Sequence, residues 1–171
     1  MKKGYVHIYT GNGKGKTTAS FGLALRASGA GLKVFIGQFV KGMFYSELNI
    51  LPKIENITLK QYGQDCFIVN KPTENDIKIA KDGLNEIKEV LQSGKYDLVI
   101  LDEANIALYY ELFSTEELID ILKNRASKTE VVITGRKAPE KLIEYADLVT
   151  EMKEIKHYYT QGVQAREGIE K

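Results

Sequence analysis

Residues 10–18 read TGNGKGKTT, and they lie between an apolar segment and a segment rich in Ala and Leu. The preceding residues 5–9 are β-prone, and the following residues 17–30 have a helical composition. A glycine-rich loop that leads from a strand into a helix is the setting in which phosphate-binding loops occur. We therefore predict a strand, a phosphate-binding loop (P-loop) and a helix in this order.

The residue types of this loop suit the binding of phosphate. Glycines allow backbone N–H groups to close around phosphate oxygens, and the start of the helix adds positive potential. Lys16 supplies a positive charge, and Thr17 offers a hydroxyl group to Mg²⁺. The alternative is a glycine-rich turn with a surface lysine, which the strand, the spacing and the helix together disfavour.

The loop departs from the strict pattern at one position. A glycine is expected five residues before Gly15, but Thr10 stands there, and counted from Gly11 the loop is one residue short. We therefore expect a tighter phosphate cradle. Sequence drift is one explanation, and a triphosphate held differently from that of an ordinary ATPase is the other.

A second apolar segment ends in acidic residues. Residues 98–101 are continuously apolar, as expected for a strand buried on both faces of a parallel sheet, and Asp102 and Glu103 follow. A carboxylate at this place can bind Mg²⁺ directly or through water, whereas the alternative is that it only solvates a loop. Thr17, Asp102 and Glu103 are therefore the candidate metal ligands, and either acid is a candidate for the closer one.

Strand and helix patterns alternate along the rest of the chain. Further strands are predicted at residues 33–40, 57–62, 131–134 and 148–150. Apolar residues between Thr73 and Gln92 recur with the three- and four-residue spacing of an amphipathic helix. Ser114 with Glu117 has capping-box spacing, and Pro139 fits the first turn of a helix.

This alternation predicts a three-layer α/β fold of the P-loop NTPase (RecA-like) type, with a mainly parallel sheet and helices on both faces. Residues 1–171 are expected to form a single nucleotide-binding domain, because this length suits one hydrophobic core. Residues 153–171 are predicted to be a polar tail.

Composition limits the class of protein. The chain has one cysteine, which excludes an internal disulfide, and its formal net charge of +1 gives no general attraction for nucleic acid. No apolar segment approaches the roughly 20 residues that span a bilayer, and no signal-peptide pattern is present. We expect a soluble, cytoplasmic protein without a nucleic-acid or membrane partner.

Several blocks of the sequence together resemble one family. They are TGNGKGKTT at 10–18, QFVKG at 38–42, ILDE at 100–103, TGRKAP at 134–139, ADLVTEM at 146–152, KH at 156–157, AR at 165–166 and GIE at 168–170. In this order they resemble the P-loop ATP:corrinoid adenosyltransferases, which act on cob(I)alamin or cob(I)yrinic acid a,c-diamide. The resemblance covers nearly the whole chain.

The resemblance implies an activity and a set of site residues. The family transfers the 5′-deoxyadenosyl group of ATP to Co(I) of a reduced corrinoid and releases triphosphate, with Mg²⁺ as cofactor. Catalytic roles then fall to Lys16, Thr17 and Glu103. Arg136 is a candidate phosphate ligand, with a surface ion pair as the alternative. The residues expected to hold the triphosphate are Gly11, Asn12, Gly13, Lys14, Gly15, Lys16, Thr17 and Thr18.

The resemblance also implies partners and exposes two departures. It implies a homodimer and an electron donor such as a reduced flavoprotein. Family members carry a phenylalanine and a tryptophan before the amphipathic helix, but this chain has no Trp, so Phe67 is the candidate corrin-facing aromatic residue, with a core position as the alternative. They also carry an N-terminal extension over the site, whereas here the first predicted strand starts close to Met1.

Two other functional classes fit a phosphate-binding loop. A kinase or ATPase would act at the γ-phosphate, with Glu103 orienting water and Arg136 as an arginine finger. A regulatory module would use nucleotide binding as a switch. The phosphate product distinguishes them, because adenosyl transfer releases triphosphate and the first alternative releases ADP.

Overall fold

A single parallel sheet organises the molecule. The computed structural model describes residues 2–64, 68 and 71–170. Within them the strand order is β3-β2-β4-β5-β1-β6, and every neighbouring pair is parallel. The strands are β1 (Val6–Thr10), β2 (Val34–Phe39), β3 (Ile57–Tyr62), β4 (Leu98–Asp102), β5 (Glu130–Thr134) and β6 (Leu148–Glu151). These bounds confirm the predicted parallel sheet.

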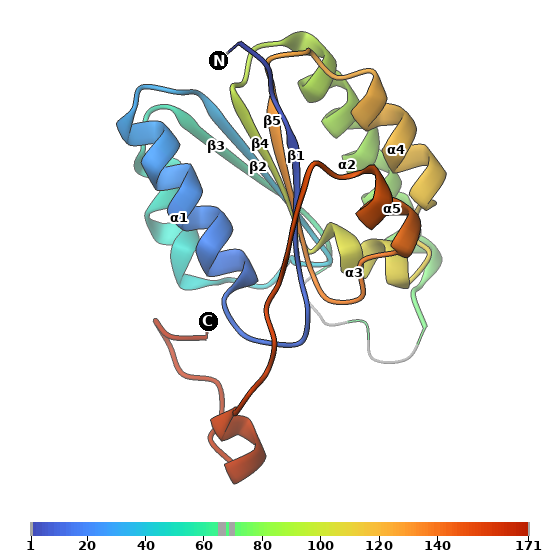
Figure 1. Ribbon diagram of the computed structural model, residues 1–171. Coiled ribbons are helices and arrows are strands. Elements are labelled where there is room, and N and C mark those ends of the chain that lie inside the picture. Colours follow the sequence, from blue (N-terminus) through green and yellow to red (C-terminus); the bar gives the residue numbers. More distant parts are fainter. Residues whose placement is uncertain (1, 65–67, 69–70, 171) are drawn as a thin grey trace.

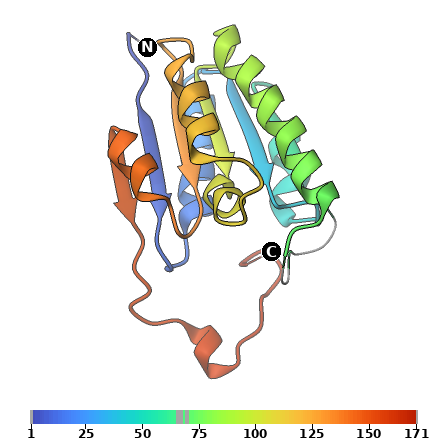
Figure 2. The same cartoon turned by 90° about the vertical axis from the view of Figure 1, so that its right-hand side faces the viewer.

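Helices cover both faces of the sheet. Figures 1 and 2 show α1 (Lys16–Gly29) on one face, and α2 (Glu74–Ser93) with α4 (Thr115–Lys123) on the other. Two shorter helices are α3 (Ala104–Tyr109) and α5 (Glu140–Tyr145), and three 3₁₀ turns are η1 (Ser46–Asn49), η2 (Leu51–Lys53) and η3 (Tyr158–Gln161). The three-layer α/β architecture expected of a P-loop NTPase fold is therefore confirmed.

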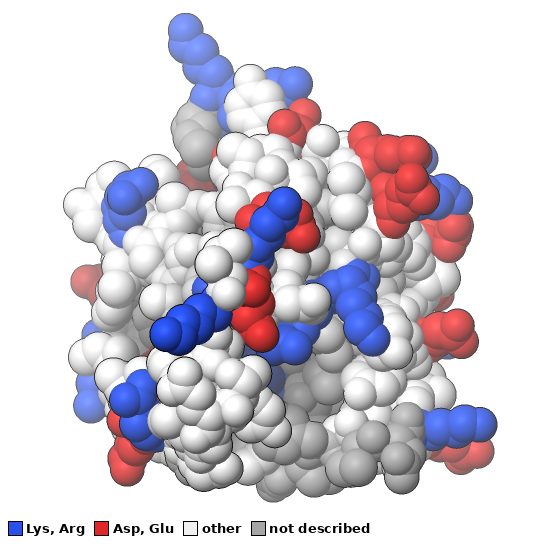
Figure 3. Space-filling view, turned by 60° about the horizontal axis from the view of Figure 1, so that its bottom comes forward, with Lys and Arg blue, Asp and Glu red and all other residues white. Residues whose placement is uncertain are grey.

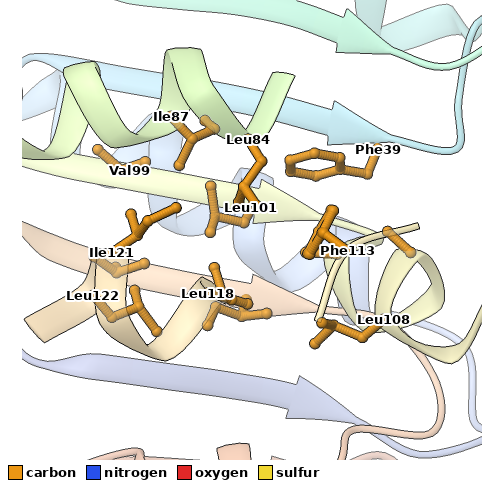
Figure 4. Packing of buried hydrophobic residues seen from close by; sticks show 14 of the residues in the cluster. Phe39, Leu84, Ile87, Val99, Leu101, Leu108, Phe113, Leu118, Ile121 and Leu122 are labelled. Atoms are coloured by element: carbon orange, nitrogen blue, oxygen red, sulfur yellow. The ribbon is translucent and has the colours of Figure 1, made fainter. Parts of the chain in front are cut away.

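Alternation along the buried strands divides the core between the two faces. On β2, Val34 and Ile36 pack on the α1 side, whereas Phe35 and Phe39 pack on the α2 and α4 side. Figure 4 shows the second cluster, in which helix side chains meet those of β4 around Leu101. The central strands are thus covered on both faces, which explains their uninterrupted apolar sequences.

Capping residues fix the start of two helices. Thr73 with Asp76 and Ser114 with Glu117 each form a reciprocal capping box, so both predicted helix starts are confirmed. Pro139 was predicted within a first turn, but it is the N-cap of α5 and lies just before that turn. Its ψ of 139° is extended, so the helical conformation starts only at Glu140.

The polar C-terminal residues contain local structure and contact the glycine-rich loop. After β6 the chain runs below the carboxyl ends of the strands and forms η3 (Figure 1). The Lys14 side chain contacts Tyr158 and Glu170 from this segment, at 3.0 and 2.7 Å. The predicted polar tail is thus largely exposed, and it contains a 3₁₀ turn and contacts to the glycine-rich loop. None of the described helices combines the length and the hydrophobicity that a membrane span requires.

A paired substitution tests the packing of α2 on β3. A Cβ atom at Gly83 would lie 2.4 Å from the ring of buried Tyr62. We expect Gly83→Ala to lower the free energy of unfolding by about 1–3 kcal/mol, although alanine favours helix formation by about 1 kcal/mol. Gly22 in α1 has nothing within 4 Å of such a Cβ, so Gly22→Ala should stabilise the protein. Urea unfolding followed by circular dichroism measures both, and equal effects would contradict this packing.

Candidate nucleotide site

A cleft of about 760 Å³ opens at the carboxyl ends of the strands. Its walls come from the glycine-rich loop, the first three turns of α1, the segments after β2 and β5, the start of α3 and the C-terminal residues. Figure 3 looks at the molecule from this end and shows basic and acidic side chains interleaved over its middle. The charged residues that line the cleft are Lys14, Lys16, Lys41, Glu47, Glu103, Arg136 and Glu170.

The loop between β1 and α1 wraps around its own lysine. Gly15 takes a left-handed conformation with φ 117°, which turns the chain into the helix. The Lys16 ammonium group donates to the backbone oxygens of Gly11 and Gly13 at 2.8 and 2.7 Å. Burial lowers the pKa of Lys16, and the Arg136 charge adds to this shift, whereas Glu103 opposes it. The loop thus holds a partly desolvated cation at the edge of the cleft.

The end of β6 supports the loop from behind. The N–H group of Met152 donates to the Thr10 oxygen at 2.8 Å, and the N–H group of Gly13 donates to the Met152 oxygen at 2.7 Å. A Cβ atom at Gly13 would lie 2.7 Å from that same oxygen. Thr10, where the strict pattern has glycine, is the last residue of β1 and is buried. The short loop is therefore closed by contact with β6.

Asp102 links the loop to the neighbouring strands. Its side chain is fully buried, and it accepts four hydrogen bonds. Oδ1 accepts from the hydroxyl groups of Thr17 at 2.9 Å and Thr134 at 2.7 Å. Oδ2 accepts from Gln38 at 3.2 Å and from the Lys41 ammonium group at 2.8 Å. The carboxylate thus fixes the hydroxyl group that was predicted to face the metal.

Glu103 directly follows β4 and has a strained backbone conformation. Its φ of 57° is left-handed, and its N–H group donates to the Thr134 hydroxyl group at 3.0 Å. Burial and the Asp102 charge raise the pKa of Glu103, while Lys41, Lys16 and Arg136 oppose the rise. The Glu103 carboxyl group therefore lies among three cations on the wall of the cleft.

The structure brings most of the predicted site residues together. Gly13, Lys14, Gly15, Lys16, Thr17, Thr18, Glu103 and Arg136 all line the cleft. Among the described residues, Gly11 and Asn12 do not line it, and Asp102 lies behind its wall. Phe67 falls outside the described residues.

Sequence reasoning missed the residues that surround Asp102. Gln38, Lys41 and Thr134 belong to blocks that carried the family resemblance, but their roles had no local signature. Pairing of β2 with β4 places Gln38 directly beside Asp102 in the sheet. The strand order, which the sequence does not reveal, was the missing information.

Comparison with known proteins agrees with this geometry. The family model for the ATP:corrinoid adenosyltransferases BtuR/CobO/CobP matches residues 2–170. The chain belongs to this family. A corrinoid adenosyltransferase from Sinorhizobium sp is 37% identical over 99% of this chain and 81% of its own length. The Escherichia coli (strain K12) corrinoid adenosyltransferase is 34% identical, and corrinoid adenosyltransferase CobA of Salmonella typhimurium is 33% identical, each over 99% of this chain and 86% of the relative.

The raised pKa of Glu103 predicts a pH-dependent cost in stability. A carboxyl group whose pKa rises on folding contributes stability below its unfolded value of about 4.3, and this contribution is lost as pH rises through the folded value. Glu103→Gln cannot ionise, so we expect it to be more stable than the native chain near pH 8 and about equal near pH 4. Denaturant unfolding at both pH values checks this expectation.

Glu144 is the matched control, because it is an exposed glutamate of α5. Glu144→Gln should show no such pH-dependent gain. A Glu103→Gln variant that tracks the native chain at every pH would contradict the effect of burial.

Proposed function

We propose that this protein transfers the 5′-deoxyadenosyl group of ATP to Co(I) of a corrinoid and releases triphosphate, in cobalamin biosynthesis or salvage. The corrinoid is cobalamin or cob(I)yrinic acid a,c-diamide. The single observation that carries this proposal is the family match over residues 2–170. The cleft adds support, because it joins the glycine-rich loop, Lys16 and Glu103 at one end of the sheet.

The reaction places simple demands on the protein. The Co(I) substrate supplies the electron pair for a new bond to the 5′ carbon, and the bond from that carbon to the triphosphate oxygen breaks. Triphosphate leaves with the electron pair of the broken bond, so no general base is needed. The chain must therefore position the two substrates and stabilise negative charge on the leaving group. Lys16 and Arg136 are the cations on the cleft that we assign to this task.

The oxygen donors of the cleft suit Mg²⁺. The Thr17 hydroxyl group is held 2.9 Å from Asp102, and Glu103 presents a carboxyl group to the same cleft. We assign Thr17 and Glu103 to hold the ion, with Asp102 behind them, and Mg²⁺ when bound supplies positive charge for the leaving triphosphate.

The family resemblance supports a proposal for partners and location. We propose a homodimer in the cytoplasm whose corrinoid substrate is reduced to Co(I) by an electron donor such as a reduced flavoprotein. Phe67 stays the proposed corrin-facing aromatic residue, and residues 1–171 the proposed single domain. Sedimentation equilibrium tests the dimer independently of activity.

The phosphate product tests the proposed reaction. Anaerobic incubation with Mg²⁺, ATP and chemically reduced cob(I)alamin should yield a light-sensitive adenosylcorrinoid and inorganic triphosphate. Lys16→Met removes the loop cation and should lower this rate by about a hundredfold or more. Lys153→Met is the control, because Lys153 is an exposed residue just after β6 and should have no effect. The corrinoid spectrum and phosphate chromatography provide the readouts.

The same assay separates the alternatives. ADP without corrinoid alkylation would replace the proposal by a kinase or ATPase. Nucleotide binding without turnover of either kind would favour a switch module.

A further inference from the structure

Lys41 is a second lysine of the nucleotide cleft, and it is partly buried. It follows β2, whereas Lys16 begins α1, so the two cations come from different elements. Only 12% of the Lys41 side chain is exposed, yet the residue lines the cleft together with Lys16. A lysine is rarely buried to this extent without a specific partner or role.

The backbone around Lys41 is held in an unusual conformation. Val40 directly before it has a φ of 56°, and a left-handed conformation is rare for a β-branched residue. The Val40 N–H group donates to the Tyr62 oxygen at 3.2 Å. A Cβ atom at Gly63 would lie 2.5 Å from the Lys41 nitrogen, so the ends of β2 and β3 are in close backbone contact. This contact turns the chain so that Lys41 faces the cleft.

Among the described residues, the ammonium group of Lys41 forms an ion pair with Asp102. It lies 2.8 Å from Oδ2 of Asp102 and 5.0 Å from the centre of the Tyr45 ring. Burial is the largest single influence and lowers the pKa of Lys41, but the charge and hydrogen bond of Asp102, with the charges of Glu103 and Glu47, together raise it. An ammonium group has three N–H donors, and the contact with Asp102 uses one of them. The Lys41 ammonium group therefore has donor capacity beyond Asp102, and it lines the cleft.

We propose that Lys41 is a second triphosphate-binding lysine, which the turn at Val40 directs into the cleft and which contacts the leaving group directly. This inference rests on the proposed function, because it takes triphosphate as the leaving group. The other lysine of the loop, Lys14, instead donates to the Glu170 carboxylate at 2.7 Å. Lys41 and Lys16 would then bind the triphosphate from two sides. Fixed cations placed where charge develops cost no reorganisation during the reaction.

A purely structural role is the competing explanation. A buried carboxylate needs a counter-ion, so Lys41 could serve only to neutralise Asp102. Lys41→Met alone does not separate the two roles, because it also leaves the Asp102 charge uncompensated beside the triphosphate. The comparison must therefore be made in a background in which residue 102 is neutral.

Asp102→Asn provides that background. Asparagine keeps an oxygen that can accept from Thr17 and Thr134, and it removes the buried charge that would destabilise Lys41→Met. The affinity for inorganic triphosphate is measured by calorimetry, without corrinoid, for Asp102→Asn and for Asp102→Asn combined with Lys41→Met. Circular dichroism and thermal unfolding verify that both variants are folded.

Direct contact predicts a clear difference. The double variant should bind triphosphate about ten- to a hundredfold more weakly than Asp102→Asn alone. Lys60→Met in the same background is the matched control, because Lys60 forms an ion pair with Glu86 away from the cleft, and its affinity should not change. Equal affinities of Asp102→Asn and the double variant would overturn the inference and leave Lys41 as a counter-ion only.

The result is independent of the proposed reaction. Failure of the proposed function appears as ADP in the turnover assay, whereas failure of the Lys41 inference appears as equal triphosphate affinities. Native protein that releases triphosphate in turnover, together with equal affinities in the Asp102→Asn background, would retain the reaction and reject only the role of Lys41.

Discussion

The buried carboxylate of Asp102 is the interaction on which the site depends. It accepts hydrogen bonds from Thr17 of α1, from Thr134 of β5 and from Lys41, which follows β2. An ionised group without solvent contact is costly unless hydrogen bonds and a counter-ion compensate it. The four hydrogen bonds supply that compensation, and they also require the ends of three strands and one helix to keep their relative positions. The electrostatics of one residue therefore define the geometry of the cleft floor.

The glycine-rich loop is constrained from the opposite side. Pairing of β1 with β6 brings Met152 against Gly13, so the loop is fixed by backbone contacts before any ligand arrives. The contact also leaves no room for a side chain at Gly13, since a Cβ atom there would lie 2.7 Å from the Met152 oxygen. A loop built in this way differs from one whose N–H groups all face the ligand, since the Gly13 N–H group is already bonded to protein.

Much of this arrangement could be predicted from sequence, and the rest could not for definite reasons. Apolar segments of strand length and the capping pairs have local signatures, which is why the sheet and the helix starts were correct. The partners of Asp102 depend on strand order, because only the placement of β2 beside β4 brings Gln38 and Lys41 to the carboxylate. The left-handed conformations of Val40 and Glu103 had no signature either, since neither residue is glycine.

These two left-handed residues show how the core serves the site. Val40 and Glu103 each follow the end of a strand, and β2 and β4 are fully buried along their length. Such conformations cost about 1–3 kcal/mol each, and they persist only where the surrounding structure determines them. The apolar layers on both faces of β2 and β4 provide that support, because neither strand can shift without disturbing two packed cores. Strain at the cleft is thus sustained by burial in the sheet behind it, and this burial is what allows Lys41 and Glu103 to face the cleft.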